Sequence, residues 1–173
     1  MTVNRVSKLL ACSALLGAAL IGECVTVAEL TAKGARQGPF KAGKTKSDKI
    51  RLLKFTLTDA KPVDARGMQT GRALLTEVTI EIDAEDMFNF KDAYNTNEVL
   101  SNVEIDVSDG VGVGRGTLAG KVFETVKLTN ATVKSLSEVF VHGDTPVTTI
   151  SFTYQRLEVM VDGKTTISDA SRV

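Results

Sequence analysis

The sequence is poor in the residues that build many binding and catalytic sites. Its 173 residues include two cysteines, one histidine, three prolines and no tryptophan, and aromatic residues make up 5% of the chain. So few cysteines and histidines exclude a framework of several disulfides and leave too few ligands for a typical zinc site. The low aromatic content also disfavours a pocket for sugars or apolar ligands, because aromatic side chains usually line such pockets.

Neither sign of charge is in excess. The chain has 21 basic and 21 acidic residues, so its formal net charge is zero, whereas nucleic-acid-binding domains usually carry a basic surplus. With 43% hydrophobic and 24% charged residues, the composition is that of an ordinary globular domain, and the length fits one domain with or without a targeting segment. We therefore expect a single globular domain that does not bind nucleic acid.

The first 22 residues differ from the rest of the chain. Arg5 and Lys8 precede an uncharged, mostly apolar run from Leu9 to Gly22. A short basic start followed by such a run is typical of a secretory signal, and the run is too short for a membrane-spanning helix, which needs about 20 residues. We predict that residues 1–22 are a signal peptide, that residues 23–173 form the mature domain, and that the protein is secreted or periplasmic. An amphipathic or buried N-terminal helix of the folded domain is the alternative.

Alternation of apolar and polar residues dominates the mature chain and predicts β-strands. Asp162-Gly163 predicts a tight hairpin, because a type I′ turn requires positive φ at both central positions. The segment from Thr31 to Asp48 is rich in Gly, Lys and Ser and offers only Phe40 for burial, which predicts a long exposed loop. The strands are expected at residues 25–30, 50–58, 75–82, 99–107, 122–128, 132–141, 148–161 and 165–168.

One segment has helical instead of alternating spacing. Acidic residues at positions 83–86 precede Phe90, Ala93 and Tyr94, which lie on one helical face. This pattern predicts a helix near residues 84–96. Six to eight strands with one helix predict a mainly β fold, an antiparallel β-barrel with one short α-helix, because closure of a sheet removes its exposed edges.

Four motifs invite a chemical interpretation, and a structural interpretation is simpler for each. Gly110–Gly116 lacks the Gly-Lys-Ser/Thr ending and the following helix of a phosphate loop, so it indicates a flexible hairpin. His142 lies in a turn-like sequence, and the chain has no nucleophile-elbow motif to accompany it. The acidic residues at 83–86 lack the spacing of a calcium loop. Asn130-Ala131-Thr132 matches a glycosylation pattern but falls in a predicted strand. We predict no catalytic residue, no cofactor and no metal, and a hydrolase is the least favoured class.

Several segments resemble, in the same order, those of one known family. Residues 146–158 (PVTTISFTYQRLE) are similar to a family's closing strand, and residues 127–137 (KLTNATVKSLS) to its K-L-x-N-A-x-V strand. Residues 77–83 stand where that family has an acidic strand end ahead of its helix, and residues 34–55 resemble its first loop and second strand. The family is the haemolysin-coregulated protein (Hcp) family, the inner-tube proteins of type VI secretion systems, and the resemblance extends over about residues 24–168.

This resemblance implies a structural, non-enzymatic protein. Six copies would close into a homohexameric ring, and the rings would stack into a hollow tube that carries secreted effectors and meets sheath or tip proteins. The loop at 34–48 is expected to be too polar for its own domain to hold it. The resemblance implies that this loop clamps a neighbouring copy. Its expected contact residues are Gly38, Pro39, Phe40, Lys41, Lys44 and Lys46. The alternative from a different class is a secreted monomeric β-barrel that acts as a binding module.

Overall fold

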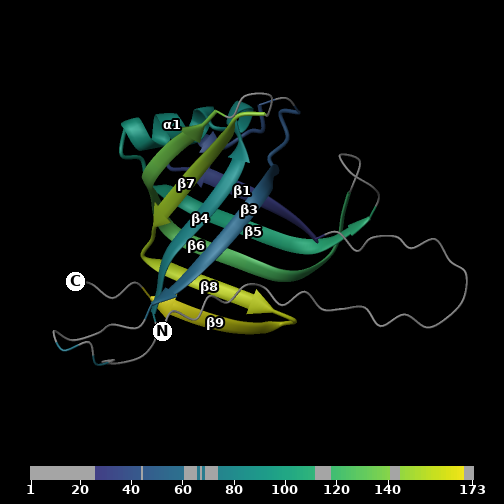
Figure 1. Ribbon diagram of the computed structural model, residues 1–173, viewed down its shortest axis with the longest axis vertical. Helices are drawn as coiled ribbons and strands as arrows, with labels where there is room; N and C mark the ends of the chain where they lie inside the picture. Colours follow the sequence, from purple (N-terminus) through teal and green to yellow (C-terminus); the bar gives the residue numbers. More distant parts are fainter. Residues whose placement is uncertain are drawn as a thin grey trace, which may run out of the picture.

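The computed structural model describes residues 26–43, 45–60, 66, 68, 74–111, 118–140 and 145–169. The predicted signal at 1–22, Lys44, the glycine-rich residues 112–116 and His142 lie outside the described residues. Within them the chain is mostly strand with a single α-helix (Figure 1). The elements are β1 (Thr26–Gly34), β2 (Gly38–Pro39), β3 (Ile50–Ala60), β4 (Leu74–Asp83), the 3₁₀-helix η1 (Ala84–Asp86), α1 (Phe88–Asn95), β5 (Leu100–Val111), β6 (Leu118–Val139), β7 (Val147–Thr153), β8 (Arg156–Val161) and β9 (Lys164–Asp169).

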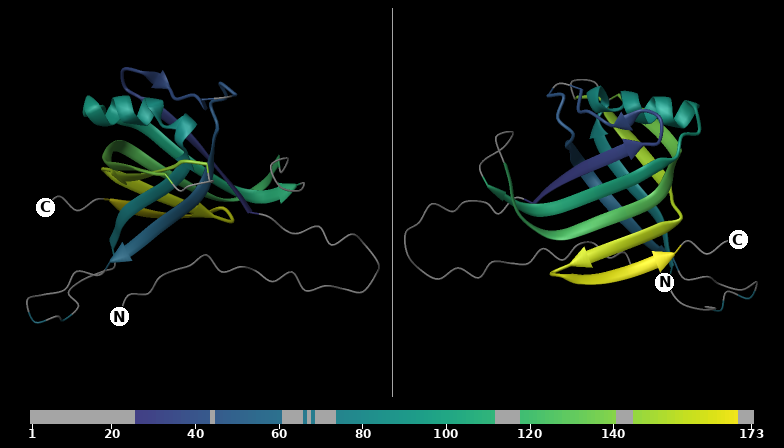
Figure 2. Two further views of the ribbon diagram at one scale, coloured as in Figure 1. Left: turned by 45° about the horizontal axis from the view of Figure 1, so that its top comes forward. Right: turned by 180° about the vertical axis from the view of Figure 1, so that it is seen from behind.

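Six of these strands close into an antiparallel barrel, which can be followed in Figure 2. The pairing runs β1–β3–β4–β7–β6–β5 and returns from β5 to β1. Strand β6 has 22 residues and pairs with three other strands. Its first part pairs with β5 and β8, and its last part pairs with β7. The predicted antiparallel barrel with one short α-helix is confirmed.

The β8–β9 hairpin extends the sheet beyond the barrel. β8 pairs with the first part of β6, and β9 pairs with β8. The turn between them has φ of 47° at Asp162 and 76° at Gly163, as the predicted tight hairpin requires. Likewise, β5 and β6 pair antiparallel up to Val111 and Leu118, so the glycine-rich stretch between them connects two strands of a hairpin.

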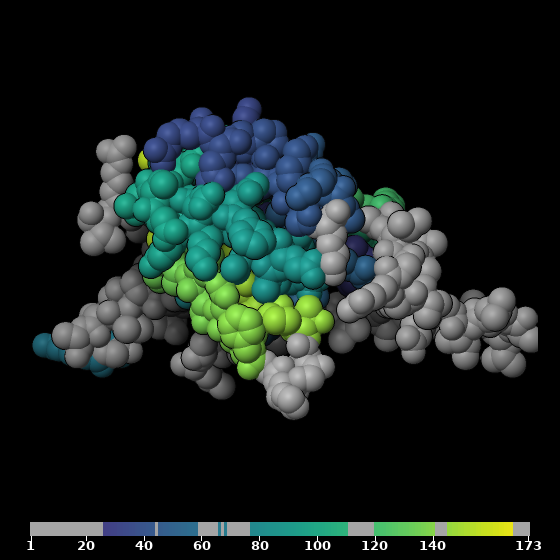
Figure 3. All heavy atoms as spheres, turned by 90° about the horizontal axis from the view of Figure 1, so that it is seen from above, coloured from purple at the N-terminus to yellow at the C-terminus, as the bar shows by residue number. Residues whose placement is uncertain are grey.

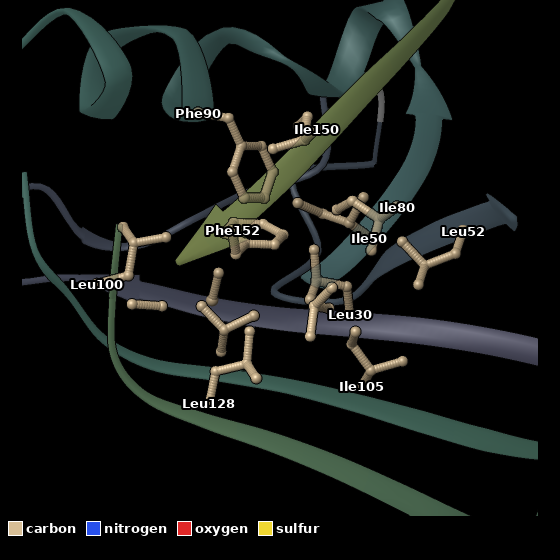
Figure 4. Close-up of a cluster of buried hydrophobic side chains, with 14 of the residues drawn as sticks. Leu30, Ile50, Leu52, Ile80, Phe90, Leu100, Ile105, Leu128, Ile150 and Phe152 are labelled. Atoms are coloured by element: carbon tan, nitrogen blue, oxygen red, sulfur yellow. The ribbon is translucent and has the colours of Figure 1, made fainter. Parts of the chain in front are cut away.

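Inward-facing side chains of the six strands form one hydrophobic core (Figure 4). Ile150, Phe152 and Tyr154 alternate along the chain and are all buried. Phe90 of α1 covers one end of the barrel, with its ring centroid 6.2 Å from that of Phe152. The largest side chains with less than 2% exposure are Phe40, Phe90, Phe152, Leu30, Ile50, Ile80, Ile82, Leu100, Ile105, Leu128, Ile150 and Leu157.

Two predicted strand boundaries were wrong. Residues 148–161 form two strands instead of one, because the inward positions change from even numbers, ending at Tyr154, to odd numbers from Leu157. Residues 122–128 and 132–139, which fall in two predicted strands, belong to the single strand β6, which ends at Val139. Asn130 has φ of 50°. The alternation of inward and outward residues shifts there while β6 continues, and in the sequence this shift looks like a break between two strands.

Candidate intersubunit loop and exposed strand edges

A buried glutamate holds the turn between β1 and β2. Glu98 follows α1 and is 3% exposed. The backbone N–H groups of Arg36 and Gln37 donate to its Oε1 over 2.6 and 2.9 Å, and Gln37 Nε2 donates to its Oε2 over 3.0 Å. The first residues of the predicted clamp loop are therefore fixed to the segment that follows the helix.

These hydrogen bonds also set the charge of Glu98. The N–H of Gln37, with that of Arg36, lowers the pKa of the Glu98 carboxyl from its ordinary value, although burial acts in the opposite direction. Donors aimed at a carboxylate favour its charged form. The turn thus surrounds a buried negative charge at neutral pH. Glu98 was not predicted as a site residue, because its only signal in the sequence is an acidic residue shortly after a helix.

Gly34, the last residue of β1, has no room for a side chain. A Cβ there would lie 2.4 Å from Glu98 Oε1 and 3.1 Å from Phe40 Cε1, and contacts below 3.0 Å force a neighbour to move. Glycine at this position therefore lets the carboxylate reach the turn and lets the aromatic ring pack beneath it.

The segment predicted to be an exposed loop is partly buried in its own domain. Phe40 is fully buried and its ring meets that of Phe90 edge-on, with centroids 5.0 Å apart. Ala42 is also buried. In addition, β1 continues to Gly34 and β2 pairs with it. The expectation of a long exposed loop that its own domain cannot hold was wrong, because one aromatic side chain in a polar stretch suffices to attach it to the core.

The next residues rest on the short helix η1. The backbone N–H of Gly43 donates to Asp86 Oδ1 over 2.6 Å. A Cβ on Gly43 would lie 2.2 Å from the carbonyl oxygen of Glu85. The acidic cluster at 83–86 therefore begins the helical segment, as predicted, and also holds the loop in close contact with that segment.

The lysines of the loop differ in their surroundings. Lys41 forms an ion pair with Asp48, and Lys49 forms one with Glu29 at 3.0 Å. The hydrogen bond and charge of Glu29 raise the pKa of Lys49. Lys46 is exposed and has φ of 56°. Among the predicted contact residues that the structure describes, Pro39, Lys41 and Lys46 are exposed, Gly38 is half-buried, and Phe40 lies in the core.

The edges of β9 and of most of β3 are among the strand edges left open within the described chain. β9 pairs with β8 alone among the described strands. β3 pairs with β1 only at Ile50 and Arg51, and from Leu52 to Ala60 its described pairing is with β4 alone. Open edges present N–H and C=O groups that can pair with another chain. These two edges belong to different parts of the sheet.

Two shallow hollows are present, one lined by residues of β6 and the β8–β9 hairpin, the other beside Val99 and Tyr154. The described residues contain no group of three or more His, Cys, Asp or Glu side chains placed to hold a metal ion. Within the same part of the chain, no helix is long and apolar enough to cross a membrane.

No protein-family model matches the sequence, and no curated protein matches it. Solved structures do match the fold. The chain is similar to an Hcp protein crystal structure with a TM-score of 0.70 at 16% identity, covering 86% of this chain and all of that one. It is also similar to a mutant form of Hcp1 from the E. coli EAEC 042 pathovar, with a TM-score of 0.65 at 12% identity, covering 83% of this chain and 98% of that one. A third similar structure is secreted Hcp3 from Pseudomonas aeruginosa, with a TM-score of 0.61 at 18% identity, covering 86% of this chain and 100% of that one.

The structure is thus a closed six-stranded antiparallel barrel, extended by one hairpin and covered at one end by a helix. This arrangement is the Hcp fold, the fold of tube proteins of type VI secretion systems. The resemblance found in the sequence is confirmed at the level of the fold.

Proposed function

We propose that this protein is a tube-forming subunit of a type VI secretion system. The observation that carries the proposal is the match of the whole length of a solved Hcp protein to 86% of this chain. Six copies would close into a ring, and stacked rings would carry effectors and meet sheath or tip proteins. The work is mechanical, so the protein is not an enzyme.

The open edges of β9 and β3 support assembly. Proteins usually protect an open edge by covering it, charging it or pairing it. Because the edges of β9 and β3 are different surfaces, a contact that paired them between copies would be heterologous, and a heterologous contact builds either a closed ring or an open filament. A monomeric secreted binding module, the competing function, would leave both edges open.

We further propose that the loop at 38–46 contacts a neighbouring copy. Phe40 fastens the loop to its own barrel and Lys41 pairs with Asp48, so the neighbour would meet Pro39, Lys44 and Lys46. Exposed ion pairs each contribute about 0–1 kcal/mol and weaken with salt, so the loop acts through contacts repeated around the ring.

We also propose export through residues 1–22. A short basic start and an apolar run precede the domain, and such a segment is removed on secretion. Mass spectrometry of the exported protein should place its N-terminus between about residues 20 and 29, just after the apolar run, with the earlier sites expected. An intact Met1 on the folded, exported protein would contradict this.

Light scattering coupled to size-exclusion chromatography tests the assembly. The full chain should elute with a mass near six copies, about 110 kDa for an 18.5 kDa subunit, or a multiple of it. Lys44→Glu with Lys46→Glu should shift the mass toward one subunit, while Lys44→Arg with Lys46→Arg should leave it unchanged. A wild-type monomer at high micromolar concentration would favour the binding-module function instead.

A further inference from the structure

One acidic side chain of β6 lies on the inner side of the barrel wall. Glu124 is opposite Val107 of β5 in the antiparallel pairing, and Val126 follows two positions along β6. Val107 and Val126 are both buried members of the hydrophobic core. Directly opposed residues, and residues two apart in one strand, lie on the same side of a sheet. The carboxyl group of Glu124 therefore shares the side of the core residues, where it is half-buried.

The β8–β9 hairpin borders Glu124 from the other neighbouring strand. Glu124 and Val161 are the pair at which the register between β6 and β8 ends, next to the hairpin turn. The N–H of Asp162 donates to the carbonyl of Phe123 over 3.1 Å, so the turn is attached to β6 one residue from Glu124. Among the described strands, β9 pairs with β8 alone. The contact of β8 with β6 at this point therefore also determines how firmly β9 is held.

This junction lies away from the end of the barrel that α1 covers. In Figure 3, side chains of α1 (teal) and of the segment between β1 and β3 (blue) cover the helix end of the molecule. Figure 1 shows the β8–β9 hairpin at the opposite end. The described residues paired beside Glu124 come instead from strands β5 and β8.

Most charged side chains of the neighbouring strands lie on the outer side of the wall. They alternate with the inward residues along β1, β5, β6 and β8, and each has a polar partner there. These pairs are Glu29 with Lys49, Glu104 with Lys127, Asp106 with Thr125, and Glu158 with Arg156. Asp109, Lys121 and Asp162, which lie nearer to the hairpin turn, are exposed.

One cation is on the same side of the sheet as Glu124. Lys164 of β9 is opposite Val161, so β8 separates it from Glu124 by about 10 Å, the width of two strand spacings. Within the described part of the chain, Glu124 has no hydrogen-bond or ion-pair partner. The carboxyl group is thus withdrawn from water beside valine side chains without a group that compensates its charge.

A carboxyl group in these surroundings responds to pH in the opposite way to Glu98. Burial raises the pKa of Glu124 above its ordinary value, because the loss of water penalises the charged form. The folded state therefore binds this proton more tightly than the unfolded state. The stabilisation is fully present below the ordinary glutamate pKa and is lost as the pH rises through the folded pKa.

We infer that Glu124 is a pH-dependent switch for the attachment of the β8–β9 hairpin. The protonated side chain lets the hairpin pack against β6, and the ionised side chain loosens the junction because the carboxylate requires water. The open edge of β9 is then held more firmly in acidic than in basic solution. The inference concerns a single barrel, so it does not depend on the proposed tube function.

Hydrogen exchange of the full chain, followed by mass spectrometry, tests this switch because exchange reports local opening. After correction for the intrinsic effect of pH on exchange, wild-type peptides from β8 and β9 should lose protection between about pH 5 and about pH 8. Peptides from β4 and β7 should change less. Glu124→Gln cannot ionise and keeps the shape of the side chain, so its hairpin should stay protected at both pH values. Glu124→Met replaces this variant if it fails to fold.

Glu104→Gln is the matched control. It removes a carboxylate from the outer side of the neighbouring strand β5, so its hairpin should lose protection as the wild type does. A wild-type hairpin with equal protection at both pH values, or the same loss in Glu124→Gln, would overturn the inference. A Glu124→Gln hairpin less protected than the wild type at the higher pH would also overturn it, because the carboxylate would then be stabilised by a partner such as Lys164.

Discussion

Replacing Phe40 with alanine tests whether the loop is part of the folded domain. The side chain is fully buried, its ring meets Phe90 edge-on with centroids 5.0 Å apart, and it lies directly under Gly34. Alanine would leave a cavity between the loop and the helix-covered end of the barrel. It would also remove the aromatic attachment that keeps residues 38–43 in place.

The expected cost is large. Truncation of a buried phenylalanine destabilises by about 3–5 kcal/mol, and the lost edge-on pair accounts for about 0.5–1.5 kcal/mol of this beyond the buried area. Domains of this kind have total stabilities of about 5–15 kcal/mol, so the variant should lose a substantial share. At about 2–4 °C per kcal/mol for this size, the Tm should fall by roughly 6–20 °C.

Urea denaturation followed by circular dichroism measures this loss, with Phe140→Ala as the control. Phe140 is 72% exposed, and exposed substitutions usually change the free energy of unfolding by less than about 0.5 kcal/mol. If Phe40→Ala costs under about 1 kcal/mol and resembles the control, the loop does not depend on the core, and the reasoning about its attachment is refuted.

Three further substitutions separate the other interactions. Because the folded pKa of Glu98 is lowered, the stabilisation from its carboxylate is present above the ordinary glutamate pKa and is lost as the pH falls through the folded pKa. Glu98→Gln should therefore cost about 1–3 kcal/mol of unfolding free energy at pH 7. The difference in stability between this variant and the wild type should shrink below about pH 4, as urea titrations at several pH values would show. Gly43→Ala should cost more than Gly163→Ala, because its Cβ would meet a backbone oxygen at 2.2 Å whereas Gly163 has open space and only a positive φ; equal Tm values would contradict this. Phe152→Ala should cost about 3–5 kcal/mol in unfolding experiments, and a cost below 1 kcal/mol would show that the core is misassigned.

The sequence predicted the fold class because the strands carry their own alternation. β4 alternates cleanly, and its inward residue Ile80 is paired with Ile150 of β7; both are fully buried. The Asp162-Gly163 hairpin and the helix near 84–96 were also predicted correctly. Each of these signals is local, so no knowledge of the tertiary structure is needed to read it.

The candidate site was harder to predict because its contacts are distant in sequence. Glu98 lies more than 60 positions from the turn it holds, and Gly43 contacts Asp86 across 43 positions. The polar composition around Phe40 suggested that the loop is exposed. The loop is instead held to the domain because the side chain of Phe40 packs against α1. The open edges of β3 and β9 likewise follow from strand order, which periodicity does not specify.

Electron microscopy of the negatively stained full chain tests the central claim most directly. A tube-forming subunit predicts hollow rings with six repeats in end-on views, and stacks of such rings at higher concentration. Compact particles of single-subunit size across the same concentration range, with an intact fold by circular dichroism, would contradict the account.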